Sequence, residues 1–208
     1  MNYYKLFLMF SFVQFFIHSI DAKPSNPSKL SKVERQEVKY KYSSFKEAEK
    51  EKNYLKFVGS STKFKLFTTS FEGYAKEFSF SFDKNEMTLT NVEISIVANQ
   101  IDTDNDTRND KMYQKCLVVE KYPRITAKIP KAFILKDGEV AETDVILTIK
   151  DKDLSRKLKY TTKENQGIFE IHFNTDFSFL EAGIEDPSIA IAKVSELFLI
   201  EGTIQLKK

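Results

Sequence analysis

The stretch FSFSF at residues 78–82 decides the fold class, because it alternates strictly between an aromatic and a small polar residue. In an extended strand, successive side chains point to opposite faces. Phe78, Phe80 and Phe82 therefore share one face, and the two serines between them lie on the other. This pattern predicts a β-strand with one buried face.

Similar apolar rows recur along the chain. VEISI places Val92, Ile94 and Ile96 on one face, and GIFEIHF does the same for Phe169, Ile171 and Phe173. With one convincing helix, near residues 108–116, roughly eight to ten such strands predict an antiparallel sandwich or closed barrel. The further candidate strands are YLKFV, KFKLF, RITAKI, VILTI, KLKYT and FLIEGTIQL.

The acidic stretch IDTDNDTRND at residues 101–110 resembles the start of a calcium-binding loop. Its sixth position, counted from Asp102, is Thr107 rather than glycine, and its twelfth is Tyr113 rather than glutamate. We therefore expect no metal site here. Thr107 and Asp110 instead predict a polar turn that begins a helix, in the manner of a capping box.

Motifs for catalysis do not stand out in the sequence. His172 is the only histidine outside the N-terminal segment, and alternation places it opposite Phe169, Ile171 and Phe173, facing outward. A phosphate-binding loop, a dinucleotide-binding glycine motif and a G-x-S-x-G elbow are all missing. We expect no catalytic residues, no metal ligands and no cofactor, although paired carboxylates could still act as acid and base.

Charge gives little indication of a macromolecular partner. The 32 Lys+Arg and 30 Asp+Glu residues leave a net charge of +2, which does not favour a nucleic-acid partner. The densest charge run, KDKDLSRKLK at residues 150–159, predicts a solvated hairpin or barrel rim. The alternative is transient contact with an anionic membrane surface through Arg156, Lys157 and Lys159.

The N-terminal segment is typical of an export signal. Lys5 precedes the apolar run LFLMFSFVQFFI, and Ala22 offers a cleavage site. We expect residues 1–22 to be a signal peptide, 23–52 a polar linker or N-terminal extension, and 53–208 the folded domain, in a periplasmic or secreted protein. The alternative is an uncleaved anchor. The single cysteine, Cys116, allows no intrachain disulfide and is expected to be a small buried residue with a raised pKa.

A longer match covers residues 101–123, IDTDNDTRNDKMYQKCLVVEKYP. This stretch resembles the bacterial YceI-like family of exported lipid-binding proteins, which share I-D-T-x-N, an Arg followed by Asp or Asn, a helix and V-E-K-Y-P. The similarity continues through ILTIKDKDLSRKL and the C-terminal strand, although Asp151 replaces a usual glycine and GSST at residues 59–62 replaces an N-terminal H-S pair. The matching residues are Ile101, Asp102, Thr103, Asn105, Arg108, Asn109, Met112, Val119, Glu120, Lys121, Tyr122 and Pro123.

The resemblance implies a lipocalin-like closed antiparallel β-barrel of about eight strands with one short helix, whose interior holds a long isoprenoid or similar lipid. The alternatives are an enzyme acting on an apolar substrate at the barrel mouth, and a ligand-free barrel that binds a protein partner, because such barrels can also be filled by side chains. The sequence is compatible with either a monomer or a homodimer. The candidate cavity-lining residues are Phe64, Leu66, Phe78, Phe80, Phe82, Val92, Ile94, Ile96, Phe169, Ile171, Phe173, Phe198 and Ile200.

Overall fold

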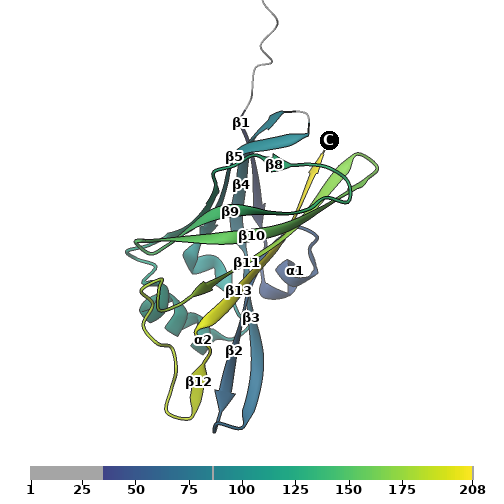
Figure 1. The fold of residues 1–208 in the computed structure, drawn as a ribbon. Helices are drawn as coiled ribbons and strands as arrows, with labels where there is room; N and C mark the ends of the chain where they lie inside the picture. Colours follow the sequence, from purple (N-terminus) through teal and green to yellow (C-terminus); the bar gives the residue numbers. More distant parts are fainter. Residues whose placement is uncertain (1–34, 86, 208) are drawn as a thin grey trace, which may run out of the picture. The chain divides into compact units, whose positions relative to one another are not determined.

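A computed structural model describes residues 35–85 and 87–207, so the predicted signal peptide at residues 1–22 lies outside the described part. The described residues form an antiparallel sheet that curls into a barrel, with short helices packed beside it (Figure 1). The elements are β1 (Arg35–Lys41), α1 (Phe45–Lys50), β2 (Tyr54–Lys63), β3 (Phe67–Ala75), β4 (Glu77–Asn85), β5 (Thr88–Val97), η1 (Ala98–Gln100), β6 (Ile101–Asp102), α2 (Asp106–Lys111), η2 (Met112–Leu117), β7 (Arg124–Ile129), β8 (Phe133–Ile134), β9 (Val140–Ile149), β10 (Lys152–Asn165), β11 (Ile168–Ser178), β12 (Ala192–Val194) and β13 (Leu197–Lys207).

The barrel shape follows from the strand order β1-β4-β5-β7-β9-β10-β11-β13-β2-β3-β6. Only Lys76 separates β3 from β4 in the sequence, yet these two strands lie near opposite ends of that order. The sheet therefore curls until it returns to the same stretch of chain. The predicted all-β antiparallel fold is confirmed, with the sheet curled into a half-barrel.

The sheet has thirteen strands among the described residues, rather than about eight. Two long strands are each interrupted, and the short strands β8 and β12 and the N-terminal strand β1 raise the number further. One long strand breaks at Lys76, and the other breaks at the short helix η1 between β5 and β6. The two interruptions lie beside each other, because the backbone N–H of Lys76 donates to the carbonyl of Gln100 at 2.8 Å.

Alternation along the strands produces the core, as the sequence predicts. Phe78, Phe80 and Phe82 in β4 are between 1% and 4% exposed, and Phe169 and Ile171 in β11 are equally buried. These side chains pack together at the end of the barrel formed by β4, β5 and β11. Burying a large apolar side chain contributes about 1.5–3 kcal/mol, so this packed end supplies much of the stability.

The folded unit begins before the predicted boundary at residue 53. Strand β1 pairs with β4 in the register Val38↔Phe80, within the segment expected to be a linker or extension. Helix α1 follows, and Ser44 caps it by accepting a hydrogen bond from the backbone N–H of Glu47. Phe45 packs edge-on against Tyr74, with ring centroids 5.1 Å apart. The high charge content of this segment concealed both elements.

The expected strand KFKLF is instead the turn between β2 and β3. The backbone N–H of Leu66 donates to the carbonyl of Lys63, and Phe64 and Lys65 have φ angles of 50° and 62°. Phe64 is 63% exposed and Leu66 is 77% exposed. The prediction that these two residues line a cavity is wrong, because the hairpin turns at this point and leaves no opposite wall for them to pack against.

The predicted helix is present as α2 followed directly by the π-helix η2. Its N-cap is Asn105 rather than Thr107, since the Asn105 side chain accepts from the backbone N–H of Arg108 at 2.9 Å. Val118, with a left-handed backbone, ends η2. In the part of the chain that the structure describes, no helix has the length and apolar character required to span a membrane.

Candidate functional site

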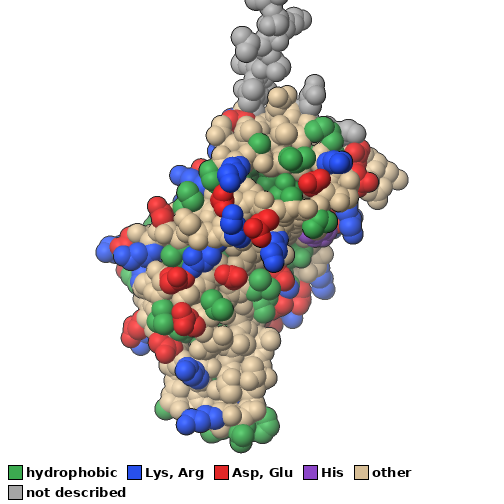
Figure 2. Space-filling view, in the orientation of Figure 1, with side chains coloured by type: hydrophobic (Ala, Val, Ile, Leu, Met, Phe, Trp, Pro, Cys, Tyr) green, Lys and Arg blue, Asp and Glu red, His purple; other side chains and the backbone are tan. Residues whose placement is uncertain are grey.

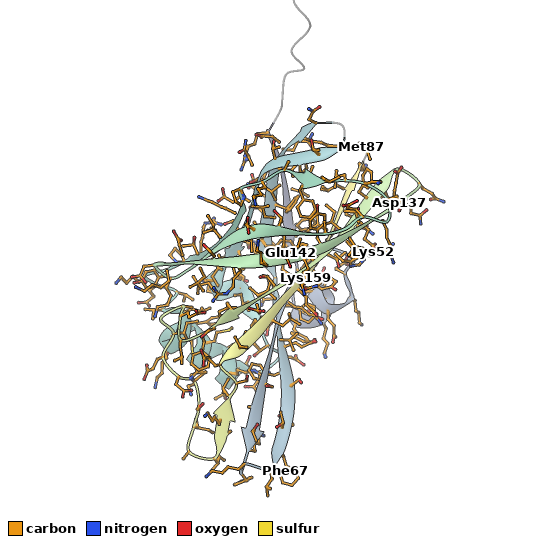
Figure 3. The ribbon with its side chains drawn as sticks, in the orientation of Figure 1. Lys52, Phe67, Met87, Asp137, Glu142 and Lys159 are labelled. Carbon is orange, nitrogen blue, oxygen red and sulfur yellow. The ribbon has the colours of Figure 1, made fainter. Side chains whose placement is uncertain are left out.

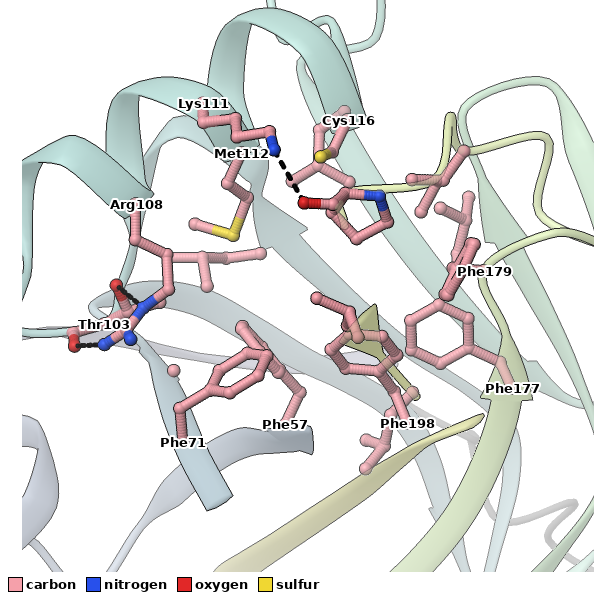
Figure 4. Close-up of a pocket in the computed structure, with 18 of the residues that line it drawn as sticks. Phe57, Phe71, Thr103, Arg108, Lys111, Met112, Cys116, Phe177, Phe179 and Phe198 are labelled. Atoms are coloured by element: carbon pink, nitrogen blue, oxygen red, sulfur yellow. Dashed lines mark hydrogen bonds between the residues drawn. The ribbon is translucent and has the colours of Figure 1, made fainter. Parts of the chain in front are cut away.

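A cavity of about 320 Å³ lies between the barrel strands and the helices α2 and η2 (Figure 4). Some of its lining residues, such as Leu55 and Phe198, also belong to the apolar core. Its walls come from β2, β3 and β13, from the helices α2 and η2, and from the irregular segment 179–194. The lining residues are Leu55, Lys56, Phe57, Ser61, Phe71, Gly73, Ala75, Ile96, Ile101, Thr103, Arg108, Lys111, Met112, Cys116, Leu117, Ile125, Ile149, Phe177, Phe179, Ile184, Pro187, Ile189, Ala192, Val194, Phe198 and Ile200.

An aromatic cluster around Phe198 makes up much of the wall. The centroid of its ring lies 5.6 Å from that of Phe177, 5.7 Å from Phe57 and 6.0 Å from Phe71. Phe179 contacts the same ring edge-on at 6.3 Å. These stacked and edge-to-face contacts stabilise the rings against each other, so the wall keeps its shape.

Two glycines make room for this cluster on the strands. A Cβ atom added at Gly73 would lie 2.2 Å from Cε1 of Phe57, and one added at Gly59 would lie 2.5 Å from Cε1 of Phe198. Both distances are far below van der Waals contact. The rings can therefore lie flat over the strands because glycine occupies these positions.

The helical wall presents soft apolar side chains. Met112 and Cys116 lie one turn apart and point into the cavity (Figure 4), in agreement with the face predicted for them. The Cys116 side chain is partly buried, and burial raises the pKa of its thiol above the ordinary value. The thiol is thus mainly protonated at neutral pH and acts here as a small apolar group.

Two cationic side chains on α2 border the cavity. The guanidinium of Arg108 donates to Oγ1 of Thr103 at 2.9 Å and to the Thr103 carbonyl at 2.6 Å, and lies 5.1 Å from the ring centroid of Phe71. Burial lowers the pKa of Arg108, but an arginine stays charged at neutral pH. Lys111 donates from Nζ to the carbonyl of Pro187 at 2.6 Å.

The acidic stretch holds the beginning of α2. Oδ1 of Asn109 accepts from the backbone N–H and the hydroxyl of Thr103, at 3.0 and 2.7 Å. The Asn109 amide donates to Asp102, which also accepts from the backbone N–H of Asp104 and pairs with Lys76 at 3.3 Å. These contacts fix the position of Thr103, and through it Arg108. Within residues 35–85 and 87–207, no group of three or more His, Cys, Asp or Glu side chains is arranged to hold a metal.

The structure brings only part of the predicted lining to this cavity. Ile96, Phe198 and Ile200 line it. A separate void of only about 10 Å³ is bordered by Phe80, Ile94, Ile171 and Phe173. The remaining predicted residues within the barrel, Phe78, Phe82, Val92 and Phe169, are buried in the core and line neither space. Period-2 alternation indicates which face a side chain occupies, but not how far along the barrel axis it lies.

Several lining residues were missed by sequence reasoning. Phe57 and Phe71 lie on strands whose alternation is weak, and Phe179, Ile184 and Ile189 lie in a segment without regular periodicity. A helical spacing was available only for Met112 and Cys116. His172 lies outside the cavity, on the outer face as predicted, where its ring nitrogens contact Glu170 and Thr203.

A model of the YceI-like domain family matches residues 38–206. The crystal structure of Burkholderia cenocepacia BcnA is similar with a TM-score of 0.62 and 16% identity, over 75% of this chain and 97% of that one. A polyisoprenoid binding domain from Saccharophagus degradans, implicated in plant cell wall breakdown, gives a TM-score of 0.54 and 13% identity, over 75% and 98%. No curated protein matches the chain.

Proposed function

The chain belongs to the YceI-like family, and we propose that it binds and shields a long-chain isoprenoid or similar amphiphilic lipid in the cavity described above. The observation that carries this proposal is the aromatic and aliphatic lining around about 320 Å³ of space. That volume is at the lower end of the range for small-molecule sites, roughly 300–1,000 Å³. The S. degradans neighbour, described as a polyisoprenoid binding domain, supports the choice of ligand class.

Burial of hydrocarbon provides the driving force. Each methylene moved from water into an apolar site contributes about 0.8 kcal/mol, so a few isoprene units offset the cost of leaving a membrane. The ring cluster around Phe198 offers a stiff apolar surface, while Met112 adapts to the shape of the chain. Specificity comes mainly from the length and shape of the cavity.

Arg108 provides the place for a polar end of the ligand. Its guanidinium lines the cavity and is already oriented by Thr103 and by the ring of Phe71. A phosphate or carboxylate headgroup suits a guanidinium held in this way. The hydrocarbon would then extend from Arg108 along the aromatic wall.

Binding is favoured over catalysis by the composition of the wall. No Asp, Glu or His is among the described residues that line the cavity. Acid–base catalysis by carboxylates at the barrel mouth would need such groups within hydrogen-bond reach of a substrate. We also propose that the protein is exported and acts outside the cytoplasm, on the basis of Lys5, the apolar run after it and Ala22.

The test is mass spectrometry of an organic extract of the protein purified from its native host, for the parent chain and for Cys116→Trp. Cys116 points into the cavity, so the larger side chain should compete with the hydrocarbon and lower lipid occupancy about tenfold or more. Gln114→Trp is the matched control, because Gln114 is exposed on the same helix. A parent extract without lipid, or equal occupancy in both variants, would contradict the proposal.

A further inference from the structure

Large apolar side chains are exposed together where the β2–β3 turn meets the segment before β12. We call this group the apolar tip, and Figure 2 shows hydrophobic side chains gathered there. A single exposed apolar residue is ordinary, but a contiguous group of them on a solvent-exposed surface marks an interaction site. The apolar tip consists of Phe64, Leu66, Phe67, Ile189 and Ile191, which are 63%, 77%, 65%, 57% and 53% exposed.

The two segments of the apolar tip are joined by backbone hydrogen bonds. The N–H of Phe64 donates to the carbonyl of Ile191 at 2.9 Å, and Ala192 pairs with Lys63 in the β12–β2 ladder. Ile189 and Ala192 bond reciprocally across their own turn. The side chains are therefore presented by two connected turns as one surface.

The backbone conformation of the β2–β3 turn does not favour the residues that occupy it. Phe64 and Lys65 both have left-handed backbones, in a turn where Asn-Gly is the favoured pair. A bulky aromatic residue is disfavoured in that conformation. Local turn stability therefore does not explain Phe64, and its side chain is not buried in the fold.

Charge around the apolar tip favours an anionic partner. Lys63, Lys65 and Lys193 are exposed, and none forms an ion pair among the described residues. Glu196 follows Lys193 by three residues and accepts a hydrogen bond from the hydroxyl of Ser178. Asp186 accepts from the backbone N–H of Ser188, and its pKa is lowered by the hydrogen bonds from Ser188 and also by the charge of Lys193. Aromatic and aliphatic side chains flanked by lysines are the composition that binds anionic bilayer surfaces.

The basic run 150–159 is a weaker candidate for membrane contact. It forms the β9–β10 hairpin, as predicted, but two of its cations are already paired. Arg156 contacts the carboxylates of Glu181 and Asp176, and Lys157 pairs with Asp144 at 2.5 Å. These pairs reduce the positive charge available to a lipid headgroup.

The apolar tip is continuous with the cavity. Ile189 lines the cavity and is also 57% exposed, while Ser61, Ala192 and Val194 line it from the adjoining strands β2 and β12. The turn at Phe67 and the turn near Met87 lie at opposite ends of the part of the chain that the structure describes (Figure 3). Contact at the apolar tip would thus bring a bilayer to the cavity and not to the packed core.

We infer that the apolar tip inserts into the surface of an anionic bilayer, and that lipid passes between bilayer and cavity at this end. The second half of this inference rests on the proposed lipid-binding function. Phe64, Leu66 and Phe67 enter the headgroup region, and the three lysines contact anionic headgroups. Insertion requires no catalytic step and no change in the barrel.

The chain has no tryptophan, so a single tryptophan introduced by substitution reports insertion directly. In Leu66→Trp, emission should shift to shorter wavelength and be quenched by brominated lipids when the full chain is mixed with phosphatidylglycerol vesicles. Val140→Trp is the control, since Val140 is 78% exposed and does not belong to the apolar tip. Its emission should not change, which separates insertion at the apolar tip from binding by any other segment.

A second variant tests the role of the apolar tip while preserving the fold. Phe64→Asn with Lys65→Gly installs the favoured residues for this turn, so folding is maintained and thermal unfolding serves as the check. On anionic vesicles we expect about tenfold weaker binding, and about fivefold weaker for Lys63→Gln or Lys193→Gln alone, with little effect on neutral phosphatidylcholine vesicles. Transfer of a fluorescent isoprenoid from vesicles should slow in parallel.

Each outcome decides the inference. Insertion is supported if brominated lipids quench the tryptophan of Leu66→Trp but not that of Val140→Trp. Adding the two turn substitutions should then weaken the binding to anionic vesicles. Insertion without any lipid transfer or extractable lipid supports docking of the apolar tip and contradicts the proposed function instead. If the emission of Leu66→Trp does not change and the protein still yields lipid, the inference is overturned while the proposed function stands. The inference is also overturned if the protein does not bind vesicles and instead forms a concentration-dependent dimer that the turn variant abolishes.

Discussion

Lys111 and Pro187 join two adjoining walls of the cavity. Nζ of Lys111, on α2, donates a hydrogen bond of 2.6 Å to the carbonyl oxygen of Pro187, in the segment that leads to the apolar tip. The segment 179–194 has little regular secondary structure of its own. This contact therefore holds an irregular wall against a helix.

Lys111→Met should loosen that wall. The hydrogen bond involves a charged donor, and such bonds contribute about 1.5–3 kcal/mol. We expect a fluorescent amphiphile to dissociate roughly tenfold faster, as measured by stopped-flow transfer to acceptor vesicles. Lys115→Met is the control, because Lys115 is exposed on η2. Equal dissociation rates in the two variants would show that the contact does not restrain the wall.

Enlarging a side chain should have opposite consequences at the two ends of the barrel. Ile171 is 2% exposed in the packed end, so Ile171→Trp should lower the free energy of unfolding by about 1–3 kcal/mol. The new side chain in Cys116→Trp extends into the cavity, so this substitution should lower the free energy of unfolding by less. Urea unfolding followed by circular dichroism compares them. A larger loss for Cys116→Trp would mean that the cavity does not accept added volume.

The reactivity of Cys116 should report on the cavity. Burial raises the pKa of its thiol, so the thiolate forms at higher pH than in an unfolded chain. Alkylation at pH 8 should therefore be slower in the folded protein than in urea, and the rise in rate should be displaced to higher pH. Bound lipid should slow it further. Rates that are equal in folded and unfolded protein would contradict this environment for the thiol.

Asp102 should contribute stability that depends on pH. Burial raises its pKa, but hydrogen bonds from Asn109 and Asp104 and the pairing with Lys76 outweigh this, so the pKa is lowered overall. A lowered folded pKa stabilises the protein above the unfolded value, about 3.9, and that contribution is lost as pH falls through the folded pKa. Asp102→Asn should unfold more easily at pH 6. The difference from the parent should shrink below about pH 4, as urea unfolding at each pH can show.

The sequence pattern was most informative where regular strands cross the packed core. Phe78, Phe80 and Phe82 were placed on one buried face by alternation alone, and the structure confirms that face. The same pattern failed at Phe64 and Leu66, which continue an apparent alternation into a turn. Glycine and asparagine usually mark such turns, and neither is present there.

The candidate site was predictable only in part. The helical spacing of Met112 and Cys116 put both on one face, and that face lines the cavity. The wall formed by Phe179, Ile184 and Ile189 could not be predicted, because irregular segments carry no periodic signal. Arg108 belonged to the stretch that resembled the family, but its contacts with Thr103 and Phe71 depend on how α2 is placed over β3.

The sequence by itself determined which side of each regular strand is apolar, and hence an all-β antiparallel fold, because side-chain direction in a strand depends only on the local backbone. Only the tertiary structure decided which end of the barrel is filled and which is hollow. That depends on how closely residues distant in sequence approach, as when Gly73 lets Phe57 lie flat on β3. It also decided that the turn at Phe64 and the turn at Ile191 meet, because the hydrogen bond between them joins segments far apart in the chain.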